Sequence, residues 1–313
     1  MNRRPLIVAI KRHALHDGPG IRSVVFFKGC RLRCTFCQNP EAQDTGPEIA
    51  FSAKECIECG VCREVCPHGA VDFKLPGRID RSRCDACGRC AAACPGKGLR
   101  LIGEYHPVEE LFEILLRDYG FYHHSGGGVT LSGGECALFP DYLEKLLKAL
   151  KAAGIHILVE TSGDFEYRVF RQKILPYVDV IYYDLKIFDP TIHRRITGRS
   201  NRRILDNFRL LQKESNGKVH PRIPVIPGIT DHVENLSSLV DFLTETRAEK
   251  VTLLPYNPAG LDMSLCLGKA AAPLPKRFMR PGEEKGVQEI VGKIIAKIHE
   301  RHSVLRRQKR CTD

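Results

Sequence analysis

Residues 16–41 read HDGPGIRSVVFFKGCRLRCTFCQNPE, a short apolar run that leads directly into a loop with three cysteines. The run Val24–Lys28 predicts a buried strand, and the cysteines after it are spaced C-x3-C-x2-C. Three thiolates can hold a four-iron cubane and leave its last iron without a protein ligand, open to another molecule. The cysteines alone would also suit a three-ligand zinc site. The three predicted ligands are Cys30, Cys34 and Cys37.

Two further cysteine runs repeat one motif at an offset of 28 residues. Residues 56–67 read CIECGVCREVCP and residues 84–95 read CDACGRCAAACP, each with the spacing C-x2-C-x2-C-x3-C-P. In ferredoxins with this spacing, the first three thiolates bind one cubane and the fourth binds the other. Zinc sites and disulfides are the alternatives, but two complete tandem copies favour iron–sulfur clusters. The predicted ligand sets are Cys56, Cys59, Cys62 and Cys94 for one cluster, and Cys66, Cys84, Cys87 and Cys90 for the other.

The composition is that of a folded, basic protein. Of 313 residues 43% are hydrophobic, and 48 Lys+Arg against 37 Asp+Glu give a formal charge of +11. Eleven ligand thiolates and three cluster cores would lower this charge to about +6, so we do not expect nucleic acid as a partner. We see no secretory start and no stretch of about 18 apolar residues, and therefore expect a cytoplasmic protein without a transmembrane helix.

Strands and helices alternate along the rest of the chain. Apolar runs predict the strands, amphipathic segments predict the helices, and their alternation favours an α/β fold with a parallel sheet. We expect one domain formed by residues 1–46 and 100–313, interrupted by a ferredoxin-like insert over residues 47–99, with residues 258–283 loop-like. The predicted strands after the first are 129–132, 155–160, 178–184, 219–226 and 251–255, and the predicted helices are 107–118, 140–153, 203–214, 233–248 and 284–302.

The opening stretch resembles the signature of glycyl-radical-enzyme activating enzymes, relatives of the pyruvate formate-lyase activase in the radical S-adenosylmethionine (SAM) superfamily. The resemblance continues in the family's order to about residue 260. It implies an open, partial (β/α)6 barrel, which periodicity alone does not distinguish from a doubly wound sheet. The further matching blocks are SGGGVTLSGGE (125–135), ETSG (160–163), DLKIFD (184–189), HRRITG (193–198), RIPVIPGITD (222–231) and LLPYN (253–257).

The resemblance also implies the cofactors and the chemistry. In the family, the open iron of the three-cysteine cluster binds SAM, which is cleaved reductively to methionine and a 5′-deoxyadenosyl radical. That radical takes a hydrogen atom from a glycine of a partner glycyl radical enzyme, so the step needs no acid or base of this chain. The implied SAM contacts are Phe36, Cys37, Gln38, Gly133, Gly134, Glu135, Asp184, Leu185, Lys186, Arg222 and Asn257; a monovalent cation would lie among Glu160, Thr161, the Tyr182 backbone and Asp184.

Two alternatives remain open on the sequence. One is another radical SAM reaction, on a small molecule or a tRNA, and the other is a ferredoxin-type electron carrier with a passive barrel. The insert itself predicts a relay of electrons from a flavodoxin- or ferredoxin-type donor to the SAM cluster, with a docking platform for the partner as the competing interpretation. The chain departs from the family at Asn257, where His is frequent, and at Glu160, where Asp is frequent.

Overall fold

The computed structural model describes residues 4–248 and 250–283, together with 285, 286, 289, 292 and 296. Its strands are β1 (Leu6–Ala14), β2 (Arg22–Lys28), β3 (Glu48–Phe51), β4 (Leu99–Ile102), β5 (Gly128–Gly133), β6 (His156–Thr161), β7 (Val180–Asp184), β8 (Val219–Val225) and β9 (Thr252–Pro255). Its α-helices are α1 (Val61–Glu64), α2 (Arg89–Ala92), α3 (Val108–Leu116), α4 (Tyr119–Ser125), α5 (Pro140–Ala152), α6 (Tyr167–Lys173), α7 (Pro190–Thr197), α8 (Arg202–Glu214), α9 (Val233–Glu245) and α10 (Ala259–Cys266), with 3-10 turns η1 (Pro40–Ala42) and η2 (Cys136–Leu138).

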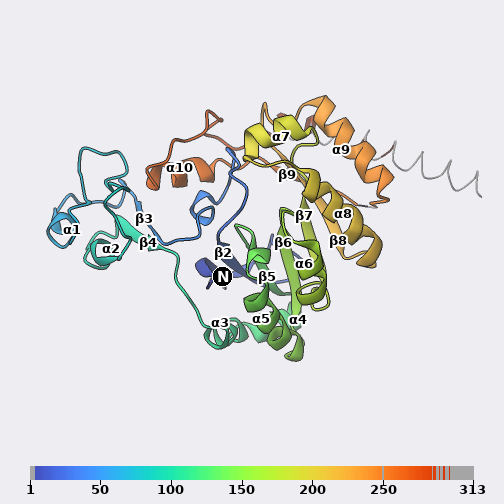
Figure 1. Cartoon of the computed structure of the whole chain (residues 1–313), viewed down its shortest axis with the longest axis horizontal. Helices are drawn as coiled ribbons and strands as arrows, with labels where there is room; N and C mark the ends of the chain where they lie inside the picture. The colour runs from blue at the N-terminus through green and yellow to red at the C-terminus, as the bar shows by residue number, and fades with distance from the viewer. Residues whose placement is uncertain are drawn as a thin grey trace, which may run out of the picture.

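The main sheet carries the strand–helix alternation that the sequence predicts. In the described part of the chain it has seven strands in the order β1-β2-β5-β6-β7-β8-β9. β1 pairs with β2 antiparallel, and each later neighbour pair is parallel. Since β1 and β9 are the two ends of this order, the sheet is open, and Figure 1 shows α8 and α9 flanking its β8–β9 end. The fold is therefore an α/β partial barrel, and the predicted parallel strands are confirmed.

The core of the barrel consists of buried strands and of helices that bury one apolar face. β2 is buried along nearly its whole length, as expected for a strand of a parallel sheet covered on both faces. Pro140 begins α5, where its fixed φ suits the first turn. The helix then buries four leucines on one face, and each contributes about 2 kcal/mol through removal of apolar surface from water. They are Leu143, Leu146, Leu147 and Leu150.

The stretch from β3 to β4 carries a second, two-stranded sheet and both repeated cysteine runs. β3 and β4 pair antiparallel at its base, and α1 and α2 lie beyond them, at the left of Figure 1. Gly60 and Gly88 precede these helices with φ of 81° and 78°, a left-handed conformation that glycine adopts without cost. The two cysteine runs thus share one local backbone, as their repeat predicts. A hydrophobic cluster of its own, including Ile49, Phe51 and Leu99, packs against the cysteines.

Some elements differ from the sequence prediction. β1 was not predicted, because its charged residues obscure the alternation and only Ile7 and Ala14 are buried. The short helices α4, α6 and α7 were also missed. The prediction that residues 258–283 are loop-like is wrong for Ala259–Cys266, where α10 lies, and is confirmed for residues 267–280, which carry neither helix nor strand. A Cβ on Gly260 of α10 would lie 2.0 Å from the Cys37 carbonyl oxygen, so this weakly patterned helix forms by packing against the cysteine loop.

The helix predicted over residues 284–302 falls almost entirely outside the described residues. Among the residues that are described, no helix combines the length and apolarity needed to cross a bilayer.

Candidate functional site

A cavity of about 480 Å³ opens at the carboxyl ends of the parallel strands. The ends of β5, β6 and β7 contribute residues to its lining. Side chains that point toward the barrel interior from neighbouring strands come together there. Most of the implied SAM contacts line it. They are Phe36, Cys37, Gln38, Gly133, Gly134, Asp184, Lys186, Arg222 and Asn257, together with Cys30 and Cys34.

Backbone hydrogen bonds hold the cysteine loop over this cavity. Cys30 N donates to Gln43 O at 2.9 Å, and Thr35 N donates to Ile196 O at 3.1 Å, so the loop is tied both to the turn that follows it and to α7. Burial raises the pKa of the Cys30 thiol to about 12 and also raises the pKa of Cys34 and Cys37. These thiols are therefore neutral unless a bound metal stabilises their thiolates.

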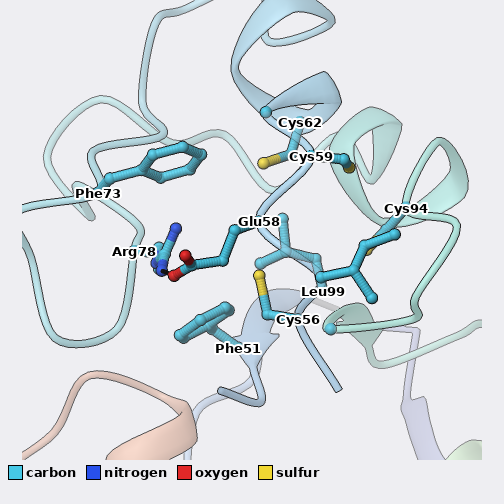
Figure 2. A pocket seen from close by; sticks show the side chains of 12 residues that line it. Phe51, Cys56, Glu58, Cys59, Cys62, Phe73, Arg78, Cys94 and Leu99 are labelled. Carbon is cyan, nitrogen blue, oxygen red and sulfur yellow. Dashed lines mark hydrogen bonds and ion pairs between the residues drawn. The ribbon is translucent and has the colours of Figure 1, made fainter. Parts of the chain in front are cut away.

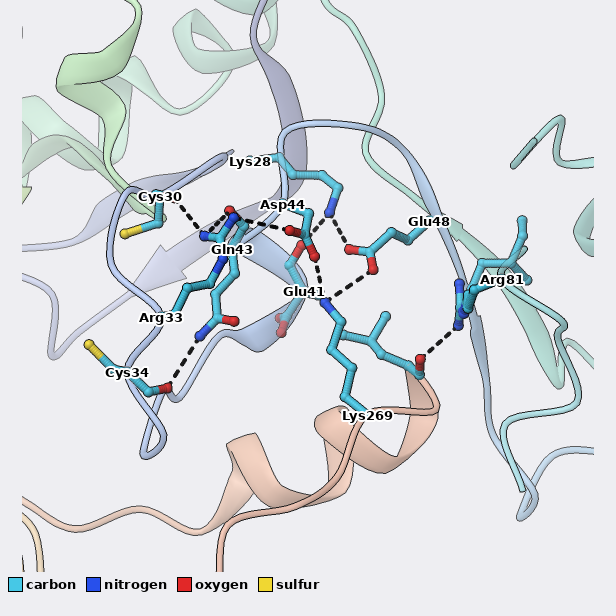
Figure 3. Close-up of polar contacts among 12 residues, drawn as sticks. Lys28, Cys30, Arg33, Cys34, Glu41, Gln43, Asp44, Glu48, Arg81 and Lys269 are labelled. Atoms are coloured by element: carbon cyan, nitrogen blue, oxygen red, sulfur yellow. Dashed lines mark hydrogen bonds and ion pairs between the residues drawn. The ribbon is translucent and has the colours of Figure 1, made fainter. Parts of the chain in front are cut away.

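A network of charged side chains joins the cysteine loop to the base of the insert (Figure 3). Arg33 donates to Cys30 O at 2.7 Å and contacts Asp44 at 3.2 Å. Lys269, just after α10, contacts the same Asp44 at 2.7 Å and Glu48 of β3 at 3.1 Å. The fully buried Lys28 donates to Glu48 at 2.6 Å. The network runs without a break from a predicted cluster ligand to the insert.

The two glycines at the end of β5 are needed for packing. Gly133 has φ of 101°, in the left-handed region. A Cβ on Gly134 would lie 2.2 Å from Gly29 O and 2.5 Å from Ala42 O, closer than any real contact. Gly134 therefore lets β5 approach the backbone on both sides of the cysteine loop, in addition to lining the cavity.

Four charged side chains cluster on one wall of the cavity. Arg222 contacts Glu160 at 2.5 Å and Asp184 at 3.0 Å, and Lys186 contacts Asp184 at 3.1 Å. Burial alone would raise the pKa of Asp184, but the charges of Lys186 and Arg222 outweigh it and lower that pKa. Asp184 is thus an anion at neutral pH, fixed between two cations. Asp184 is the last residue of β7, and Lys186 lies two residues beyond it.

Three residues of the predicted site do not line the cavity. Glu135 is fully buried and accepts hydrogen bonds from Thr161 Oγ1, Ser162 N and Ser162 Oγ, so it holds two loops together. Leu185 packs in the hydrophobic core. The Arg222 guanidinium carbon lies 4.8 Å from the centroid of the Tyr182 ring.

Other cavity residues were missed by sequence reasoning. Ser132 donates to Glu160 at 2.5 Å. Asp17, in the loop between β1 and β2, also lines the cavity. Its Oδ2 is buried without a hydrogen bond in the described residues, and Lys11 Nζ lies 3.6 Å away. The DGPG turn at residue 17 was the available signal, within the block that carried the resemblance.

Comparison with known proteins gives three domain matches and many relatives. Residues 81–240 match the radical SAM superfamily, residues 55–97 a 4Fe-4S dicluster domain and residues 16–64 a 4Fe-4S single cluster domain. The indoleacetate decarboxylase activating enzyme of Tractidigestivibacter scatoligenes is 38% identical over 85% of this chain and 87% of its own length. The isethionate sulfite-lyase activating enzyme of Desulfovibrio desulfuricans is 38% identical over 84% and 86%.

The chain belongs to the glycyl-radical-enzyme activating enzymes of the radical SAM superfamily. This activating enzyme cleaves SAM reductively to a radical that removes a hydrogen atom from a glycine of a partner enzyme. Family membership decides against a passive electron carrier. A radical SAM methyltransferase from Sphaerobacter thermophilus has the same fold, with a TM-score of 0.50 at 16% identity over 94% of this chain and 75% of that one.

The insert of the activating enzyme brings the predicted ligands together in two groups. Cys56, Cys59 and Cys62 line one hollow with Cys94 from the other run (Figure 2). Beside them Arg78 lies 5.1 Å and 4.3 Å from the ring centroids of Phe51 and Phe73 and contacts Glu58 at 2.8 Å. The second hollow is lined by Cys66, Cys84, Cys87 and Cys90. The fourth cysteine of each run thus lies beside the first three cysteines of the other run.

Proposed function

We propose that Cys30, Cys34 and Cys37 hold a [4Fe-4S] cluster whose open iron binds SAM inside the 480 Å³ cavity. Three buried thiols facing one cavity suit a cationic cluster, because burial keeps them neutral until a metal holds the thiolates. The cavity volume lies within the range of about 300–1,000 Å³ that small-molecule sites occupy. When bound, the cluster supplies the electron for SAM cleavage.

The charged wall supplies the polar contacts of SAM. Lys186 lines the same cavity as Cys30 and Cys34, and the charges of these two cysteines contribute to raising its pKa. We assign it to the SAM carboxylate, and Asp184 and Asn257 to ribose hydroxyls. Phe36, buried in a small apolar cluster with Ile226, offers a face for adenine. This arrangement of three thiols opposite Lys186, Asp184 and Arg222 is the observation that carries the proposal.

We keep the predicted cation site as a proposal, but a side chain of the protein already contacts its two carboxylates. Arg222 already contacts Glu160 and Asp184, and the Thr161 hydroxyl donates to Glu135. A monovalent cation at Glu160, Thr161, the Tyr182 backbone and Asp184 would therefore have to share the two carboxylates with a guanidinium. SAM cleavage measured in potassium and in tetramethylammonium buffers tests this: potassium should increase the rate if the cation binds.

The partner is a glycyl radical enzyme, and we propose that its glycine segment enters the cavity beside Asp17. The buried Oδ2 of Asp17, which accepts no hydrogen bond in the described residues and lies 3.6 Å from Lys11 Nζ, is an acceptor that a peptide N–H would satisfy. The relatives named above act on different enzymes, a decarboxylase and a sulfite-lyase. The substrate of this chain's own partner is thus not assigned.

We propose that residues 47–99 form a ferredoxin-like domain within the barrel domain of residues 1–46 and 100–313. Its clusters, on Cys56/Cys59/Cys62/Cys94 and Cys66/Cys84/Cys87/Cys90, would pass electrons from a flavodoxin- or ferredoxin-type donor to the SAM cluster. The charged network of Figure 3 supports this role, because it links the insert base to the Cys30 backbone. Oxygen-sensitive clusters and free thiols suit an anaerobic cytoplasm.

The test is direct. Anaerobically reconstituted protein is mixed with SAM, a chemical reductant and purified glycyl radical enzymes, beginning with isethionate sulfite-lyase and indoleacetate decarboxylase. We expect 5′-deoxyadenosine and methionine in equal amounts, and a glycyl radical signal in electron paramagnetic resonance (EPR) spectra of one partner. Lys186→Met should weaken SAM binding, while Lys213→Met, on the exposed last turn of α8, should not. SAM binding that survives Lys186→Met would contradict the assigned carboxylate contact.

A further inference from the structure

A second, more open groove of about 940 Å³ lies between the end of α7 and the start of α8. Arginine dominates its lining: Arg194 from α7, Arg199 from the connecting loop, and Arg202 and Arg203 from the first turn of α8. All four are exposed. Among the described residues no lysine lines the groove, and its acidic residues are Asp164 and Asp206.

Two of these four arginines have no side-chain partner among the described residues. In the described part of the chain, the guanidiniums of Arg194 and Arg202 make no ion pair or side-chain hydrogen bond. Arg203 reaches Asp164 only at 3.5 Å, and Arg199 Nε donates to the Arg31 carbonyl at 3.4 Å. Each guanidinium has five N–H donors in a planar fork that matches a carboxylate. The groove therefore concentrates unused donors and repelling charges on one surface.

Two short segments connect the groove to the rim of the SAM cavity. Thr161 and Ser162 line the cavity, and Asp164, two residues further on, lines the groove. The other wall is tied to the cysteine loop, since Arg33 N donates to Thr197 O at 2.7 Å. A protein that places a glycine in the cavity must cover this rim, and with it the arginines.

We infer that the arginine groove, defined by Arg194, Arg199, Arg202 and Arg203, docks an acidic segment of the glycyl radical enzyme. The inference rests on the proposed function for the identity of the partner. Arginine is enriched at protein interfaces, where lysine is depleted, and it binds carboxylates in a bidentate manner. The groove orients the partner and increases its rate of encounter, while the glycine segment occupies the neighbouring cavity.

The experiment compares two double charge reversals in the full holoenzyme. Arg194→Glu/Arg202→Glu changes the groove. Arg117→Glu/Lys213→Glu makes the same change of charge at exposed positions whose side chains make no hydrogen bond or ion pair in the described residues, one after α3 and one at the far end of α8. The partner is whichever enzyme of the panel above the wild-type protein activates. Glycyl radical formation is followed by EPR against partner concentration, and SAM cleavage is measured without partner.

We expect the groove variant to raise the apparent KM for the partner about tenfold or more and to reduce its salt dependence, with kcat near that of the wild type. The control variant should stay within about twofold, and partner-free SAM cleavage should be the same in all three proteins. Equal losses in both variants would overturn the inference, because net charge alone would explain them. An unchanged KM with slower flavodoxin-dependent reduction would also overturn it and make the groove a donor site. If the wild-type protein forms no glycyl radical on any partner, the proposed function fails first, and the inference fails with it.

Discussion

The cysteines of the barrel and those of the insert have the same predicted role in opposite environments. Cys30, Cys34 and Cys37 face a cavity of about 480 Å³ whose opposite wall is charged. The cysteines of the insert ring two hollows of about 20 and 10 Å³, with Cys59 and Cys87 exposed to solvent. Among the described cysteines that are predicted ligands, the first group borders a cavity with room for a small molecule, and the second group contains the two exposed members.

The difference lies in what surrounds the sulfur atoms. Around the barrel loop, Lys186, Arg222 and Asp184 offer specific contacts to a small molecule. In the insert, Phe51, Phe73 and Arg78 line the first hollow together with its cysteines (Figure 2), and neither hollow has the volume for a small-molecule substrate. We propose that the first region reacts with SAM and that the second conducts electrons, and the following experiments test that division.

The largest effect should come from removing the ligands of the barrel loop. Cys30→Ala/Cys34→Ala/Cys37→Ala should lower the iron content from about twelve to about eight per chain and abolish SAM cleavage. Iron analysis and 5′-deoxyadenosine formation measure the two quantities. SAM cleavage by the triple variant would show that the reaction occurs in the insert.

A nearly equal effect should follow from one methyl group at Gly134. Gly134→Ala would place Cβ 2.2 Å from Gly29 O, so the cysteine loop must move. We expect overpacking to cost about 1–3 kcal/mol and the barrel cluster to be lost or labile, while the insert clusters remain. Gly46→Ala is the matched control, because no atom lies within 4 Å of its added Cβ. Full iron content and normal SAM cleavage in Gly134→Ala would contradict this packing.

The expectation for Gly134 also shows what a sequence can reveal. The cysteine spacing alone predicts that Cys94 binds the same cluster as the first run. In ferredoxins with this spacing, the fourth cysteine of each run binds the cluster of the other run. The motif blocks located Lys186 and Asp184, but not the guanidinium bridge between Glu160 and Asp184. Lys269 and Asp44 are 225 residues apart, and no local pattern links them. Helix α10 was missed for the same reason: its packing against Cys37 O is a tertiary contact.

A smaller effect should come from the insert. Cys59→Ala/Cys87→Ala removes one exposed ligand from each predicted cluster. If the insert conducts, radical formation with flavodoxin as donor should slow severalfold, while partner binding and SAM cleavage with a small chemical reductant stay near normal. Circular dichroism and retention of the barrel cluster confirm that the variant is folded.

The competing interpretation makes the opposite prediction for the same variant. A docking platform would lose partner binding, and SAM cleavage with flavodoxin and with the chemical reductant would be equally preserved. That pair of results would remove the conducting role and leave the insert a structural one.

The smallest effect concerns the connection between the two regions. Lys269→Met keeps the apolar stem but removes the contacts to Asp44 at 2.7 Å and Glu48 at 3.1 Å that Figure 3 shows. Because these side chains are partly exposed, we expect a loss of about 0.5–1 kcal/mol and a decrease in melting temperature of about 1–3 °C. Lys276→Met, at an exposed position before Arg277, is the control.

The effect of Lys269→Met should depend on pH in a defined direction. Burial alone would raise the pKa of Asp44, but the hydrogen bond from Lys269 and the charges of Lys269 and Arg33 outweigh it and lower that pKa. A carboxylate with a lowered pKa in the folded state contributes stability above its unfolded value, and the contribution is lost as the pH falls through the folded value. The difference between wild type and Lys269→Met should therefore be constant from about pH 8 to pH 5 and shrink near pH 4. Melting curves of the two proteins across this range measure it. A difference that grows on acidification would mean that Lys269 acts through another group, and that the insert is joined to the cysteine loop by other contacts.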